Sequence, residues 1–133
     1  MLWIEPARLL LRKAQQDLVI VSRAADDFEI ADEIVGFHVQ QATEKCLKSV
    51  LAARGIAYRR THDLQELYDL LEDSGVNVPG VALDLVAWSP FAVAYRYEDW
   101  FATHPVDRAR AVDLVRALIA WVQSELAQMN PGG

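Results

Sequence analysis

The chain has 133 residues, of which 53% are hydrophobic and 24% are charged. This length suits one compact domain spanning residues 1–133, and the composition excludes an intrinsically disordered chain. The formal net charge of −6 argues against non-specific binding to a nucleic-acid backbone, because such binding needs a basic surface. It leaves room for a local basic pocket.

Neither a membrane segment nor a leader is expected. The sequence contains no run of about 18 apolar residues, and its N-terminus lacks the basic start and long apolar stretch of a signal peptide. The lone cysteine, Cys46, has no partner for an internal disulfide, and no Cys/His cluster has the spacing of a zinc site. We therefore expect a soluble, cytoplasmic protein that uses no metal and no cofactor.

Two amphipathic helices are predicted in the first part of the chain. The first starts near Pro6, a residue suited to the first turn of a helix. Its apolar residues recur every three or four positions, at Ala7, Leu11, Ala14, Leu18, Val21 and Ala25. The second helix follows a break around residues 26 and 27 and ends at Gly55, a suitable left-handed terminator. Its apolar stripe comprises Val35, Val39, Ala42, Cys46, Val50 and Ala53, widened by Leu47 and Leu51.

An acidic run lies at the junction of these two helices. It consists of Asp26, Asp27, Glu29, Asp32 and Glu33. We interpret the run as a solvated helix start, where carboxylates meet the positive end of a helix dipole, in preference to a metal site.

A third helix has clear signals at both ends. Asp63 is expected to cap its start, with Glu66 three residues later completing a capping box. The helix is expected to stop at Ser74 and Gly75. The valine-rich loop over residues 75–81 is the one place where a strand could lie, but a lone strand has no partner.

Two more helices complete the predicted fold. The fourth runs from about Val81 towards Trp88, and its continuation is expected to bend at Pro90, which lacks a backbone donor. The fifth begins at His104 and Pro105. Four or five amphipathic helices with short connections predict an all-α, up-and-down antiparallel bundle.

The second predicted helix carries a polar flank. His38, Gln41, Lys45 and Lys48 recur at spacings of three, four and three residues, so they share a face. Glu44 and Lys48 form an i, i+4 pair in the favourable order, so ordinary helix-surface chemistry also explains these charges without a function.

Two shorter motifs follow. His62 lies in the turn before Asp63, and it could simply be a turn residue. Arg96 lies between Tyr95 and Tyr97, an arrangement that suits a phosphate beside a base, because guanidinium groups grip phosphates and aromatic rings stack on bases. The same residues could instead finish the edge of a helical core. The nearby aromatic residues are candidates for either partner contact or core packing: Tyr95, Tyr97, Trp100 and Phe101.

Together these motifs resemble the HEPN domain family, named for nucleotide binding in higher eukaryotes and prokaryotes. The resemblance rests on F-H-x-Q-Q-A-x-E-K-x-L-K from Phe37, T-H-D-L from Thr61 and A-x-R-Y ending at Tyr97, in this order. It implies a bundle of four or five helices that pairs into a homodimer. It also implies partnership with a minimal nucleotidyltransferase, often in a toxin–antitoxin or related defence module.

Many relatives are metal-independent ribonucleases that use an arginine and a histidine separated by four to six residues. The arginine stabilises the phosphate, and the histidine transfers protons. No histidine of this chain has an arginine at that distance before it, and the nearest pair, Arg96 and His104, has seven residues between. His104 precedes Pro105, so it could also be a helix cap.

We therefore predict a nucleotide- or RNA-binding module, without a firm catalytic residue. The resemblance places the pocket at His38, Gln41, Lys45, Arg96 and Tyr97, with Lys48 and His62 as weaker candidates. The alternatives are a ribonuclease toxin that uses Arg96 and His104, and a helical dimer whose motifs are only structural.

Overall fold

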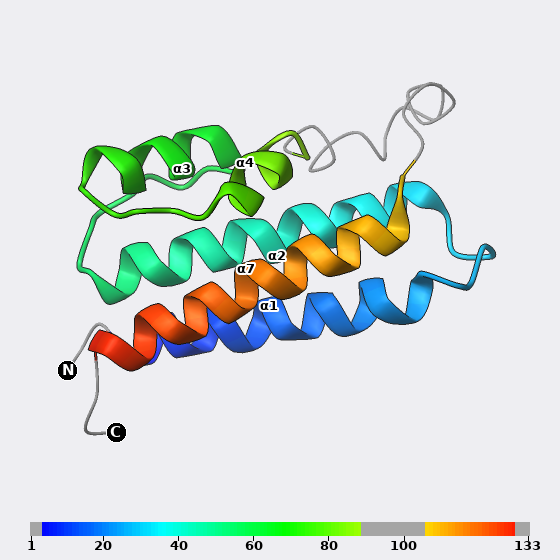
Figure 1. The fold of residues 1–133 in the computed structure, drawn as a ribbon, viewed down its shortest axis with the longest axis horizontal. Helices are drawn as coiled ribbons and strands as arrows, with labels where there is room; N and C mark the ends of the chain where they lie inside the picture. Colours follow the sequence, from blue (N-terminus) through cyan, green and yellow to red (C-terminus); the bar gives the residue numbers. More distant parts are fainter. Residues whose placement is uncertain (1–3, 89–105, 130–133) are drawn as a thin grey trace.

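The computed structural model describes residues 4–88 and 106–129, and these residues form helices without strands. The helices are α1 (Ile4–Ala24), α2 (Asp32–Ala53), α3 (Leu64–Asp73), α4 (Gly80–Val86) and α7 (Arg108–Met129). They pack on one another as a bundle (Figure 1), which confirms the all-α prediction. None of the helices in these two ranges is long and apolar enough to cross a membrane.

The three long helices α1, α2 and α7 form the body of the bundle (Figure 1). α1 runs antiparallel to α2, and the hydroxyl of Ser49 near the end of α2 donates to the carbonyl of Ala7 near the start of α1, at 2.7 Å. α7 runs in the same direction as α2, since Arg108 pairs with Asp32 at one end and Glu125 with Arg54 at the other. Any bundle of three helices contains at least one such parallel pair.

α2 is the central helix, because it contacts α1, α3, α4 and α7. From Val39 to Ala53 its side chains are buried except at Gln41, Lys45, Lys48 and Ala52. The buried positions include every residue of the apolar stripe predicted for this helix. α1 contributes Ala7, Ala14 and Val21 to the same core, whereas Leu11, Leu18 and Ala25 are partly buried against it.

Two glycines end helices by the same mechanism. Gly55 has a φ of 69° and Gly75 a φ of 86°, the left-handed region that glycine adopts without a steric penalty. After α2, Ile56 N donates to the carbonyl of Leu51 at 2.9 Å, and after α3 Val76 N donates to that of Leu71 at 3.0 Å. These bonds satisfy carbonyls at each helix end, as in a Schellman motif. In the loop after α3, the buried side chains of Val76 and Val78 add to the core without forming a strand.

The start of α3 corrects one expectation. Asp63 caps the helix, since its Oδ1 accepts from Gln65 N at 3.0 Å and Glu66 N at 3.3 Å. The reciprocal half of the capping box is wrong: the Glu66 carboxylate instead accepts three hydrogen bonds from Arg59, and Asp63 N donates to the hydroxyl of Thr61 at 3.0 Å. A charge-assisted bidentate bond is stronger than a bond to one backbone N–H, so Arg59 holds Glu66.

The bounds of the last two helices also differ from the predicted ones. α4 spans Gly80–Val86, slightly earlier than predicted, and its expected bend at Pro90 lies outside the described residues. α7 begins at Arg108 rather than at residues 104 and 105. Its cap is Asp107, whose Oδ1 accepts from Arg110 N at 3.1 Å. An aspartate is a better helix cap than the histidine or proline on which the prediction relied.

The acidic run spans the α1–α2 turn and the start of α2, and Arg108 holds this turn to α7. Asp32 and Glu33 lie in the first turn of α2, as expected for a helix start. The nearly buried guanidinium of Arg108 donates to Oδ1 of Asp32 at 2.9 Å and to three carbonyls of the turn, those of Ala24, Asp27 and Ile30 at 2.7, 3.0 and 2.6 Å. The Phe28 ring packs against the same guanidinium, with 4.9 Å between the ring centroid and Cζ of Arg108.

Arg108→Leu is expected to lower the free energy of unfolding by about 3 kcal/mol, because it leaves a carboxylate and three carbonyls of the turn without their donor. Urea unfolding followed by far-UV circular dichroism measures the loss. The matched control is Arg116→Leu on the same helix, where an exposed guanidinium lies 3.8 Å from Asp113 and should contribute under about 1 kcal/mol. Equal losses in the two variants would contradict the structural role of Arg108.

Candidate functional site

A single strip of α2 reaches the surface beyond its first turns. We call it the α2 strip: His38, Gln41, Lys45, Lys48 and Ala52, at spacings of three, four, three and four residues. Each of the five is partly exposed, whereas the side chains between them are buried. α1 borders the strip on one side through Asp17, and the segment of residues 56–62 borders it on the other through Tyr58 and His62.

Asp17 of α1 anchors the first half of the strip. Its carboxylate is 7% exposed and accepts from His38 Nδ1 at 2.9 Å and from Lys45 Nζ at 2.7 Å. Because a carboxylate only accepts hydrogen bonds, the proton of this contact belongs to Nδ1 of the imidazole. Two residues that are two helical turns apart on α2 are therefore held by one nearly buried charge on α1.

Glu44 anchors the second half. Its carboxylate is 6% exposed and accepts from Lys48 Nζ at 2.9 Å, His62 Nδ1 at 2.8 Å and Gln40 Nε2 at 3.1 Å. Burial alone would raise the pKa of Glu44, but the hydrogen bonds from Lys48, His62 and Gln40 and the charge of Lys48 outweigh it and lower the pKa below 4.5. Glu44 therefore stays ionised near neutral pH, and the Lys48 pair is partly buried rather than a surface contact.

Gln40 and Gln41 extend the Glu44 cluster along α2. Gln41 Nε2 donates to Gln40 Oε1 at 2.8 Å, and Gln40 Nε2 also donates to the backbone carbonyl of His62 at 3.1 Å. That bond fastens residue 62 to the middle of α2. Every buried side-chain nitrogen and oxygen in the described residues has a hydrogen-bond partner, so the strip is rigidly supported from beneath.

The strip and the part of α1 beside it carry more positive than negative groups. Lys13 lies on the same line of α1 as Pro6 and Asp17, at spacings of seven and four residues, so it faces the strip between them. It forms no ion pair within the described ranges 4–88 and 106–129. Three lysines and two histidines thus surround two carboxylates. This arrangement makes a local basic patch on a chain whose net charge is −6.

The structure brings together five of the residues predicted from the sequence: His38, Gln41, Lys45, Lys48 and His62. Their role in binding stays a prediction. Arg96, Tyr97 and His104 lie outside the described residues, as does the aromatic stretch around them. That Arg96 and Tyr97 share a pocket with Lys45 therefore stays a prediction.

Two residues that contact the strip were not predicted from the sequence. Asp17 lies between Ala14 and Val21 at the three- and four-residue spacing of the apolar face of α1, and a carboxylate at a buried position is a signal that could have found it. Tyr58 lies below Lys48, whose Nζ is 5.7 Å from the centroid of its ring. Nothing in the local sequence indicates that contact, because it depends on the path of residues 56–62.

A comparison with protein-family models decides the relationship that the motifs suggested. The model of the HEPN domain matches residues 7–125, most of the chain. The chain belongs to the HEPN domain family. No curated protein and no solved structure matches it. Membership links this HEPN chain, in general terms, to nucleotides and RNA, and the matched range contains all of α2 and the residues that border the strip.

Glu44→Gln is expected to destabilise the protein by about 2 kcal/mol near neutral pH, because it removes the charge that binds Lys48 and His62. The pKa of Glu44 is lower in the folded protein, so its contribution is complete above pH 4.5 and is lost as the pH falls through the lowered value. The difference in unfolding free energy between native protein and variant should therefore shrink below pH 4.5.

Denaturant unfolding at a series of pH values measures this difference. The control is Asp113→Asn, an exposed carboxylate 3.8 Å from Arg116, whose small effect should not change with pH. A Glu44→Gln difference that stays constant from pH 7 to strongly acidic solution would show that the Glu44 charge does not stabilise the fold.

Proposed function

We propose that this HEPN chain binds a nucleotide or RNA at the α2 strip, together with Arg96 and Tyr97. We further propose that it acts as a homodimer with a minimal nucleotidyltransferase in a toxin–antitoxin or defence-like system. The observation that carries the binding proposal is the α2 strip: ammonium and imidazole groups held along one line by two nearly buried carboxylates. Family membership supports the class of ligand.

A phosphate suits this line because its cations are already in place. Lys45 is fixed by Asp17 and Lys48 by Glu44, so little side-chain entropy is lost when an anion binds them. Each ammonium group has three donors and uses one in these ion pairs, which leaves others for phosphate oxygens. Binding therefore adds hydrogen bonds without breaking the pairs.

The histidines add a proton-dependent contribution. His38 and His62 each donate from Nδ1 to a carboxylate, so in the neutral ring Nε2 is an acceptor. Only the protonated ring presents an outward N–H to a phosphate.

The proposal favours binding over cleavage because no arginine precedes a histidine at the four- to six-residue spacing of the family's ribonucleases. RNA cleavage without added metal, lost in both Arg96→Ala and His104→Ala, would replace the binding proposal with the ribonuclease alternative. Cleavage that neither substitution changes would exclude that alternative.

Lys45→Met is expected to weaken binding of AMP and of a short single-stranded RNA by about tenfold, because one charged contact to phosphate is lost. Isothermal titration calorimetry measures both affinities. The single variant also leaves Asp17 with one partner fewer and should be less stable. The double variant Asp17→Asn, Lys45→Met removes that buried charge, so it should regain stability while still binding weakly.

Two further variants make this test specific. Asp17→Asn alone keeps both strip cations but removes the carboxylate that fixes Lys45, so its affinity should fall by less than that of Lys45→Met. Arg116→Met removes an exposed cation from α7 and should leave the affinity unchanged. If Lys45→Met binds AMP and RNA as well as native protein does, the strip is not the binding site.

Assembly is tested on the intact chain. The mass of one chain is 14.9 kDa, and sedimentation equilibrium should give twice this value. The double variant Trp100→Ala, Phe101→Ala should lower the measured mass towards that of a single chain. The aromatic stretch is the reason for this choice, since aromatic residues are favoured at interface centres. Co-expression with a minimal nucleotidyltransferase should yield a complex that co-purifies. A monomer that does not associate with such a partner would contradict this part of the proposal.

A further inference from the structure

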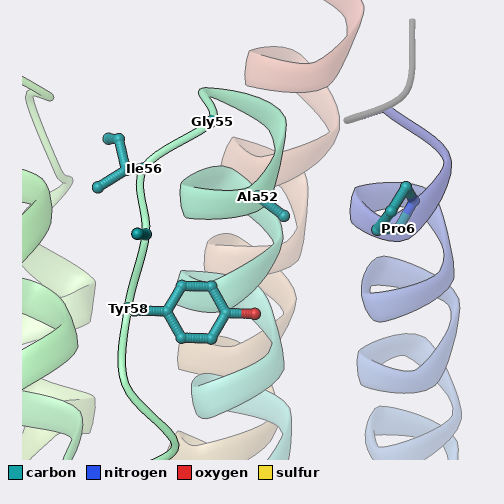
Figure 2. Close-up of a pocket in the computed structure, with 6 residues that line it drawn as sticks. Pro6, Ala52, Gly55, Ile56 and Tyr58 are labelled. Atoms are coloured by element: carbon teal, nitrogen blue, oxygen red, sulfur yellow. The ribbon is translucent and has the colours of Figure 1, made fainter.

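A hollow of about 320 Å³ lies at the end of the α2 strip, between the start of α1 and the end of α2. Its lining residues are Pro6, Ala52, Gly55, Ile56, Ala57 and Tyr58. Figure 2 shows the Tyr58 ring lying across α2, with its hydroxyl directed towards the gap between α2 and Pro6 on α1. Ala52, the last residue of the strip, points into the same gap (Figure 2).

We propose that this hollow, the Tyr58 pocket, holds the base of the nucleotide whose phosphate binds the α2 strip. This inference rests on the proposed function and adds to it a second subsite of different chemistry. The volume falls within the roughly 300–1,000 Å³ of small-molecule sites. The walls are mostly apolar, with one aromatic ring, which is the surface on which a planar base stacks.

The charges around the pocket exclude a phosphate from it and admit a base. The pocket lies at the C-terminal end of α2, the negative end of the helix dipole, and its lining among the described residues contains no lysine or arginine. Hydrogen-bond donors such as the amino group of adenine are favoured there, whereas an anion is not. Burial and the nearby Glu44 carboxylate raise the pKa of Tyr58, so its hydroxyl remains a donor at neutral pH.

The cation for the phosphate is close by on the strip. Lys48 Nζ lies 5.7 Å from the centroid of the Tyr58 ring, one helical turn before Ala52. A nucleotide with its base in the pocket can therefore extend along α2 towards Lys48 and then Lys45. The order of features along the helix, apolar pocket and then ammonium groups, matches the order of base and phosphate in a nucleotide.

A neighbouring hollow shows the opposite chemistry. It encloses about 560 Å³ against α3, and its lining includes four carboxylates and Arg59, which is already bound to Glu66. The carboxylates belong to Asp63, Glu66, Asp69 and Asp73. This surface repels phosphate, so the nucleotide is assigned to the Tyr58 pocket rather than to the larger hollow.

The test separates the base from the phosphate by comparing AMP with ribose 5-phosphate, which lacks the base, in calorimetric titrations of the full chain. Native protein should bind AMP about tenfold more tightly than ribose 5-phosphate. Ala52→Leu fills the pocket, so it should abolish this preference by weakening the binding of AMP much more than that of ribose 5-phosphate. Ala120→Leu, at an exposed position of α7, is the matched control and should keep the preference.

Two aromatic variants sharpen the result. Tyr58→Phe keeps the stacking ring and should retain most of the preference, whereas Tyr58→Leu should lose it. Circular dichroism and thermal unfolding of each variant verify that it folds. A single-stranded oligoadenylate, used as a third ligand, tells whether the base belongs to a free nucleotide or to RNA. Ala52→Leu should weaken the binding of AMP if the pocket accepts a free nucleotide, and the binding of oligoadenylate if it accepts RNA.

The outcomes distinguish this inference from the proposed function. Equal affinity of native protein for AMP and ribose 5-phosphate, with both weakened by Lys45→Met, would overturn the base pocket and leave the phosphate strip in place. A preference for AMP that survives Ala52→Leu would also overturn it. Failure of native protein to bind any of the three ligands would overturn the proposed function and the pocket together.

Discussion

The contact of Asp17 with His38 and Lys45 determines how α1 lies on α2. A carboxylate that is 7% exposed in a helix interface is unfavourable unless cationic or polar donors reach it, because burial removes its hydration. Two side chains from α2 meet that requirement, at 2.9 and 2.7 Å. The same two contacts hold the register of the two helices, since shifting α1 by one turn would break both of them. It also draws the two α2 side chains inward, so the strip is a supported line of donors rather than a loose charged surface.

Glu44 makes the corresponding contact on the other side of the strip, towards residues 56–62. Because Gln40 also binds the backbone carbonyl of His62, the segment that carries Tyr58 is attached to α2 before any ligand arrives. The pocket wall and the α2 strip therefore belong to one hydrogen-bonded unit. A change at Glu44 should be felt at Tyr58, whose ring lies near both the carboxylate and the ammonium group that it binds.

Local patterns in the sequence predicted the helices and the face shared by His38, Gln41, Lys45 and Lys48, because both depend on the repeat of the α-helix. They also predicted Gly55 as a terminator, which needs only local backbone geometry. Contacts between distant segments were missed: Asp17 lies 21 and 28 residues from its partners, and Arg108 reaches residues 76 to 84 positions away. The failed capping box at Glu66 has the same origin, since Arg59 competed for the carboxylate. Periodicity reports which side of a helix is buried, and it contains no information on which charge another element brings there.

The arrangement of α2 leaves very few of its positions free to vary during evolution. Thirteen of its 22 residues are buried, and their substitution acts on folding through cavities, overpacking or unpaired polar groups. Under the binding proposal, the five residues of the strip are the ones that a ligand touches, so their substitution acts on recognition as well. Sequence divergence among proteins with this architecture should therefore concentrate on the outer faces of α1 and α7, while α2 changes slowly along its whole length for two unrelated reasons.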